Sequence, residues 1–117
     1  MLFNKTRRKK IIEKTKNAKT FFQKFRGLMF ESEKNFNYGL IFFLENESRI
    51  NATIHMLFVF FQIDVVYLDK NKKVVDVVKN LQPFVLSCTP KKAAKYFIEL
   101  PNGKAKNVSI GNKLEWE

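Results

Sequence analysis

The stretch that decides the fold is TIHMLFVFFQIDVVYLD, residues 53–69. Alternate positions from Leu57 to Tyr67 are all apolar, and most of the positions between them are apolar as well. Strands buried on both faces have this pattern, whereas strands with one solvated face alternate apolar and polar residues. The block is longer than the usual strand of about 3–10 residues. We therefore expect a break near Gln62 and burial of both faces on either side of it.

Shorter strand patterns lie on both sides of this block. Lys70–Lys72 predicts a turn, with Asn71 suited to a positive φ, and Lys73–Val78 returns as the second arm of a hairpin. The other expected strands are Leu2–Asn4, Lys10–Lys14, Gly39–Leu44, Lys95–Leu100 and Leu114–Glu117. This pattern predicts a mainly β fold, a small β-sandwich or barrel of about 7–8 strands in a single domain over residues 1–117.

One short helix is predicted near the N-terminus, at about residues 17–26. Asn17 is suited to the N-cap, and Gly27 to a left-handed C-terminal cap. An apolar stripe follows at helical spacing: Ala18, Phe21, Phe22 and Phe25. We expect this stripe to pack into the core.

The positive charge is concentrated before residue 35. The 117-residue chain has 22 basic and 11 acidic residues, a formal net charge of +11. Arg7, Arg8, Lys9 and Lys10 form the densest cluster. They would contact phosphate or anionic lipid, or form a solvated loop or edge strand in which charge discourages edge pairing. The second interpretation is favoured, because Lys outnumbers Arg and the nearby Phe residues are assigned to the core.

Several classes of function lack their motifs. A single Cys and a single His leave no multi-Cys or multi-His metal site, and no phosphate-cradling glycine loop or hydrolase motif occurs. We expect no cofactor and no metal, and a binding role rather than an enzyme. The longest apolar run is too short for a membrane span, and the first ten residues do not resemble a secretory signal. A cytoplasmic location is expected.

Six short segments resemble, in order, the motifs of a known family. They are Arg26–Met29, Gly39–Leu44, Ile54–Met56 with Gln62–Asp69, Glu99–Gly103, and Gly111-Asn112. The chain resembles the domain of unknown function 192 family of small bacterial and archaeal proteins, over nearly its whole length. The resemblance implies a single small β-rich, sandwich-like domain and no particular activity.

The sequence departs from the family pattern in three places. His55 replaces a tryptophan, Leu57-Phe58 replaces a Lys-Asn pair, and Gln62 replaces a proline. If the Lys-Asn side chains line a polar site in other members, that site is altered here.

Asp64 is the most informative candidate residue. A carboxylate between Ile63 and Val65 in a doubly apolar block needs a partner or hydrogen bonds. It would cap backbone amides at a strand break, or act as a ligand-binding or acid–base group. We hypothesise that Arg26 is the ion-pair partner of Asp64, because both residues lie in family-like segments and an Arg side chain can form a bidentate pair with a carboxylate.

The sequence favours a binding or interaction module. Its hypothetical groove is lined by Arg26, Met29, His55 and Asp64, and binds an unknown small molecule, peptide or protein. The alternative is sequence-independent nucleic-acid binding through residues 5–24. A monomer or weak dimer is expected.

Overall fold

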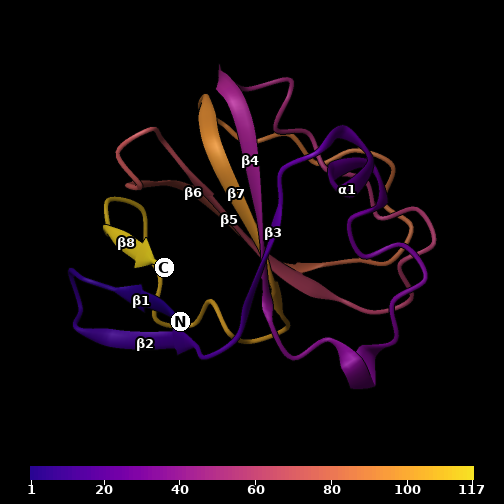
Figure 1. The fold of residues 1–117 in the computed structure, drawn as a ribbon, viewed down its shortest axis with the longest axis horizontal. Coiled ribbons are helices and arrows are strands. Elements are labelled where there is room, and N and C mark those ends of the chain that lie inside the picture. The colour runs from indigo at the N-terminus through magenta and orange to yellow at the C-terminus, as the bar shows by residue number, and fades with distance from the viewer.

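The computed structural model describes residues 1–117 and contains eight strands in two sheets (Figure 1). The larger sheet has the order β3 (Thr15–Ala18), β4 (Gly39–Ser48), β7 (Ala94–Pro101), β5 (Ile63–Leu68), β6 (Val74–Leu81). The smaller sheet has the order β2 (Lys9–Ile12), β1 (Leu2–Asn4), β8 (Leu114–Trp116). One α-helix, α1 (Phe21–Arg26), and one 3-10 turn, η1 (Glu33–Asn35), complete the fold. The prediction of a mainly β, sandwich-like fold with one helix is confirmed.

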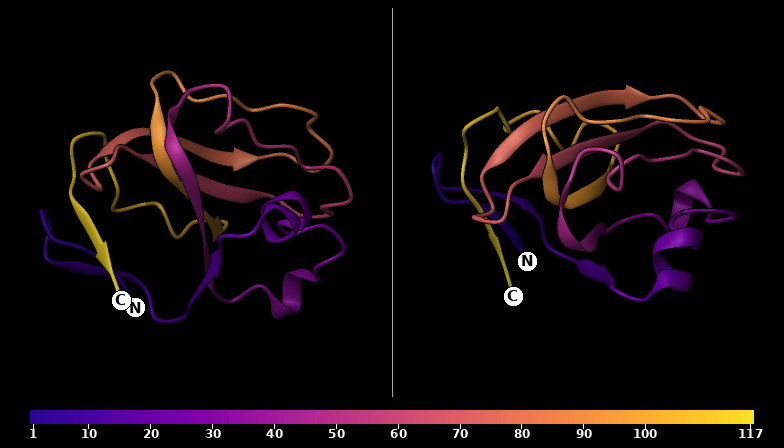
Figure 2. Two further views of the ribbon diagram at one scale, coloured as in Figure 1. Left: turned by 45° about the horizontal axis from the view of Figure 1, so that its top comes forward. Right: turned by 90° about the horizontal axis from the view of Figure 1, so that it is seen from above.

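The five-stranded sheet is covered on both faces. Along β5, Ile63, Val65 and Tyr67 enter one core of 18 buried residues, which we call the helix-side core. Val66 and Leu68 enter a second core of 12 buried residues, the hairpin-side core, together with residues of β1 and β8. Figure 2 shows the three-stranded sheet and α1 at opposite ends of the molecule. The double apolar pattern of the sequence thus reflects two-sided burial.

The long apolar block divides where expected. Its first part is a loop with a single bridge, Ile54 to Cys88, and β5 begins at Ile63. The predicted hairpin is also present, since β5 pairs antiparallel with β6. Lys72, rather than Asn71, adopts the positive φ of the turn, at 62°.

The helix is shorter than predicted. Residues 15–18 form β3, which pairs in parallel with β4, and α1 begins at Phe21. The N-cap is Thr20 instead of Asn17: Thr20 Oγ1 accepts a hydrogen bond from the Gln23 backbone N–H, and Gln23 Oε1 accepts one from the Thr20 N–H. No helix in the structure has the length and apolar character needed to cross a membrane.

The packing predicted for the Phe stripe is wrong. Phe21, Phe22 and Phe25 are 84%, 73% and 58% exposed. The helix has only six residues, and the chain turns at its end. Leu28, which follows the turn, enters the helix-side core in their place.

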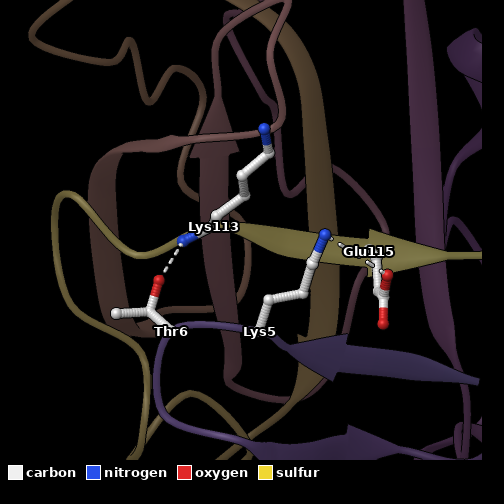
Figure 3. A network of polar contacts seen from close by, with 4 residues as sticks. All are labelled: Lys5, Thr6, Lys113 and Glu115. Atoms are coloured by element: carbon white, nitrogen blue, oxygen red, sulfur yellow. Dashed lines mark hydrogen bonds and ion pairs between the residues drawn. The ribbon is translucent and has the colours of Figure 1, made fainter.

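The two ends of the chain meet in the smaller sheet. β1 pairs with β8, and the Lys5 backbone N–H donates to the Lys113 carbonyl at 2.8 Å. Beside this pairing, Thr6 Oγ1 accepts a hydrogen bond from the Lys113 N–H at 2.9 Å, and Lys5 Nζ lies 3.9 Å from Glu115 Oε2 (Figure 3). Because both charged side chains are about half exposed, backbone pairing and burial hold this sheet over the hairpin-side core.

Candidate functional site

Segments from four parts of the sequence meet on the helix side of the five-stranded sheet. The end of α1 and the turn after it, the segment Thr53–His55, and the strands β4 and β7 enclose a cavity of about 40 Å³. Arg26, Met29 and His55, which belong to the hypothetical groove of the sequence analysis, line this cavity, and Glu99 of β7 lines it as well. The structure therefore brings together three of the four predicted groove residues.

Glu99 is the one buried ionisable side chain that lines this cavity. The residue is 4% exposed, and its Oε1 is buried without a hydrogen-bond partner. Burial raises the pKa of Glu99 to about 8, because an apolar environment disfavours the ionised form. The carboxyl group consequently keeps its proton at neutral pH. An unsatisfied buried polar atom is costly and needs an explanation.

Sequence reasoning missed Glu99. The alternation in Lys95–Leu100 places Glu99 on the same face of the strand as Phe97. In a sheet with only one buried face, a face that carries a Glu would be expected to lie in solvent. The available signal was its place in the family-like segment Glu99–Gly103, combined with the two-sided burial already indicated for the neighbouring strand.

Gly27 leaves room beside Glu99. Gly27 is the C-cap of α1, as expected, and has a positive φ of 48°, but its ψ of −125° lies outside the left-handed helical region that was predicted. A Cβ at this position would lie 3.5 Å from the Phe42 ring and 3.8 Å from Glu99 Oε1. Glycine adopts this backbone conformation at little cost. The turn after α1 can therefore pass close to the carboxyl group.

His55 is held at the mouth of the cavity. Its Nε2 lies 3.3 Å from the carbonyl oxygen of Phe25, and its Nδ1 accepts a hydrogen bond from the Leu57 N–H at 3.3 Å. These contacts fit a neutral imidazole with its hydrogen on Nε2. Both ring nitrogens are therefore occupied, and the ring packs near that of Phe25, with 6.1 Å between centroids.

Arg26 lies between this cavity and a second one of about 220 Å³, which Glu31 and Tyr38 also line. Tyr38 Oη donates to Glu31 Oε2 at 2.6 Å. That hydrogen bond is the main reason that the pKa of Glu31 is lowered, and the charge of Arg26 contributes less. Arg26 itself is exposed. Its charge therefore acts on Glu31 and leaves Glu99 unneutralised.

Asp64 is a structural carboxylate on the other face of the sheet. It is 1% exposed and accepts four hydrogen bonds. The donors are the backbone N–H groups of Asn80, Gly103 and Ala105 and the side-chain amide of Asn102, at 2.9–3.2 Å. This network ties β5 to the end of β6 and to the turn after β7.

The predicted pairing of Arg26 with Asp64 is therefore wrong, and Asp64 does not line the cavity. Val65 faces the helix-side core, so its neighbour Asp64 faces the hairpin-side core. The interpretation of Asp64 as a cap for backbone amides agrees with its contacts.

The basic cluster lies at the turn between β1 and β2. All four residues are exposed. Arg7 Nη2 donates to Ser109 Oγ at 2.6 Å, and Lys10 forms an ion pair with Glu13 at 3.3 Å. The side chains of Arg8 and Lys9 form no hydrogen bond or ion pair within the protein, and both residues are exposed.

The fold and the cavity define a small β-sandwich protein with a buried carboxyl group beside a glycine turn. Comparison with known proteins agrees with the resemblance seen in the sequence. Residues 2–116 match the DUF192 family (Uncharacterized ACR). The chain belongs to this family.

Curated relatives of similar sequence come from archaea. A UPF0127 protein of Thermococcus sibiricus is 45% identical over 119 residues, which cover 100% of this chain and 75% of the relative. A UPF0127 protein of Pyrococcus furiosus is 42% identical over 117 residues, covering 98% of this chain and 97% of the relative.

The fold also matches a solved structure. A crystal structure of a protein of unknown function from Novosphingobium aromaticivorans superimposes with a TM-score of 0.78 at 23% identity. The match covers 87% of this chain and 74% of that chain. At this identity the likeness concerns the fold.

The Asp64→Asn variant should be markedly less stable. An amide NH₂ would face backbone donors where a carboxylate oxygen now accepts, so we expect a loss of about 2–4 kcal/mol in the free energy of unfolding. Urea unfolding measures this change. Glu115→Gln, at an exposed ion pair, should change stability by less than about 0.5 kcal/mol. Equal effects of the two substitutions would contradict the structural role of Asp64.

Glu99 should make stability fall as the pH rises. Its pKa is about 8 in the folded protein against an ordinary value of 4.5. Between these values the folded state holds a proton that the unfolded state has lost, so the free energy of unfolding falls by about 1.4 kcal/mol per pH unit. The loss begins near pH 4.5 and ends near pH 8.

The measurement compares wild type with Glu99→Gln by urea unfolding from pH 5 to pH 9. The variant should lack this part of the slope, whereas other titrating groups act equally on both proteins. Parallel curves for the two proteins would show that Glu99 ionises normally.

Proposed function

We propose that the protein is a binding module that takes a polar group of a small molecule or peptide into the cavity at Glu99. The observation that carries this proposal is the buried Glu99 Oε1, which has no hydrogen-bond partner within the protein. A hydrogen-bonding group from outside would satisfy it. Glu99 takes the place of Asp64 in the predicted site, beside Arg26, Met29 and His55.

The cavity admits only the end of a ligand. A single water needs about 10–15 Å³ of such volume, so a cavity of about 40 Å³ accommodates a group of about three non-hydrogen atoms. The remainder of the ligand would lie at the mouth, against Phe25, Met29 and His55. Phe25 is 58% exposed and provides apolar contact area there.

Binding is favoured over catalysis. A carboxyl group of raised pKa also occurs in acid–base sites. Here both ring nitrogens of His55 have partners. The nucleophilic groups at the wall are the Thr53 hydroxyl and the Lys24 amine, and Lys24 Nζ donates to the Phe43 carbonyl oxygen. Nothing in the cavity pairs a base with a nucleophile, which covalent catalysis requires.

The test uses the backbone amide NMR spectrum and a library of small polar fragments. Binding fragments should shift the resonances of Gly27, Met29 and His55, and Glu99→Leu should abolish these shifts. That variant should fold, because removal of an unsatisfied buried polar group in favour of an apolar one is neutral or stabilising. Ile110→Ser, at an exposed site, serves as the control and should leave binding intact.

Two results would contradict the proposal. One is a library in which no fragment shifts the cavity resonances. The other is a set of cavity shifts that persists unchanged in Glu99→Leu.

A second candidate function is sequence-independent nucleic-acid binding through residues 5–24. Exposed Phe21 and Phe22 lie among basic residues of this segment, which holds Lys19 and Lys24, and exposed Phe25 follows directly after it. Single-strand binders combine aromatic faces for base stacking with a basic track for phosphates. In Figure 1 this segment runs from the β1–β2 hairpin along β3 to α1, across the length of the molecule.

Oligonucleotide binding at several salt concentrations tests this candidate. A phosphate-driven complex should weaken by at least about tenfold between 50 and 200 mM salt. Phe21→Ser with Phe22→Ser should weaken it through lost stacking, while Ile50→Ser should not. No retention of the protein on heparin or single-stranded DNA at low salt would exclude it.

A further inference from the structure

Glu99 has no cationic partner, although the chain holds 22 basic residues. The two ion pairs of the structure lie elsewhere, at Lys5–Glu115 and Lys10–Glu13. Lys24, at the cavity wall, directs its Nζ to the carbonyl oxygen of Phe43 at 3.0 Å. The protein therefore supplies neither a positive charge nor a hydrogen-bond donor to Glu99 Oε1.

The walls beside Glu99 are aromatic. Phe42 and Phe97, from adjacent strands, stack with 4.3 Å between ring centroids and line the cavity. Phe25 lines it from the helix side. Aromatic rings attract cations, and carboxylates accept strong hydrogen bonds from charged N–H groups. A carboxyl group among aromatic rings is thus chemically suited to a cation.

We infer that the cavity binds the ammonium group of a primary amine, with an N–H of the ammonium donating to Glu99 Oε1. This inference rests on the proposed function and narrows its ligand to one chemical class. The volume agrees with it, because about three non-hydrogen atoms correspond to a nitrogen and two carbons. A guanidinium or a quaternary ammonium group is larger than this space.

Binding moves one proton. In the empty site the Glu99 carboxyl group holds its proton, and the entering ammonium replaces that proton as the partner of the carboxylate. The O–H bond breaks, the proton leaves to solvent, and an ion pair forms. No oxidant, reductant or further reactant is needed.

The charged and titratable groups around Glu99 permit this exchange. Lys24 and Arg26 approach from α1, and His55 from the loop. Tyr38 and Tyr67 lie in the helix-side core near Glu99, and the pKa of each is raised, mainly by burial, so both stay neutral. Lys24 is hydrogen-bonded outside the cavity and Arg26 is near Glu31. An ammonium group would consequently be the nearest positive charge to Glu99.

Other ligand classes would respond differently to pH. A carboxylate would be bound by the protonated Glu99 and repelled by the ionised form, so its affinity would fall as Glu99 titrates. A neutral amide has no charge to couple with Glu99. Only an ammonium gains affinity when Glu99 ionises.

The experiment titrates the protein with propylammonium, propionamide and propionate, three probes of similar size, at pH 6, 7, 8 and 9. Amide resonances of Gly27, Met29 and His55 report occupancy of the cavity. For propylammonium, the dissociation constant should fall about tenfold per pH unit up to pH 8 and then level off. Glu99→Gln should weaken its binding at pH 8 by at least about tenfold. Glu31→Gln, at the nearby carboxylate outside the cavity, should leave it unchanged.

The outcomes separate the two proposals. Stronger binding of propionamide or propionate at the cavity would overturn the amine assignment while supporting a ligand site. Propylammonium binding that Glu99→Gln leaves intact, or that does not depend on pH, would also overturn it. If none of the three probes shifts the cavity resonances, the amine assignment fails, and the fragment library decides the proposed function separately.

Discussion

The two-sided burial of the central strand β7 constrains the rest of this structure. β7 lies between β4 and β5, and both of its faces are covered. No side chain in its middle can turn to water, so any polar group there must find a partner inside the protein or remain unsatisfied. The same constraint applies to β5. Asp64 has hydrogen-bond donors inside the protein, whereas Glu99 Oε1 has none.

Asp64 is satisfied because the chain brings backbone donors to it. The turn after β7 presents the N–H groups of Gly103 and Ala105, and the end of β6 adds that of Asn80. Glu99 faces the opposite core, where the turn after α1 passes with a glycine and without a donor. One family-like segment, Glu99–Gly103, thus contributes both a structural anchor and the centre of the cavity.

The order of the strands along the chain could be predicted from local patterns. Three of the hypothetical groove residues, Arg26, Met29 and His55, do line the cavity, whereas its buried carboxyl group, Glu99, was not predicted. The break near Gln62, the β5–β6 hairpin and the strand at β7 follow from apolar alternation and turn residues. The pairing of Arg26 with Asp64 failed because the side of a sheet that a residue faces changes with each position. The predicted burial of the Phe residues of α1 was wrong because helical spacing shows only that these side chains share one face of the helix. It does not show whether another part of the protein covers that face.

The net charge of +11 explains less than its size suggests. Basic side chains lie mostly at the surface, and none donates a hydrogen bond to the buried Oε1 of Glu99. A buried Glu99 paired with an internal lysine would be permanently ionised, at a large cost in desolvation. A protonated Glu99 is far less costly to bury, so the empty cavity is stable at neutral pH. Because the pKa of Glu99 is raised, a cation that enters the cavity can favour the ionised carboxylate and release the proton. Binding of the cation would then be coupled to the protonation state of Glu99.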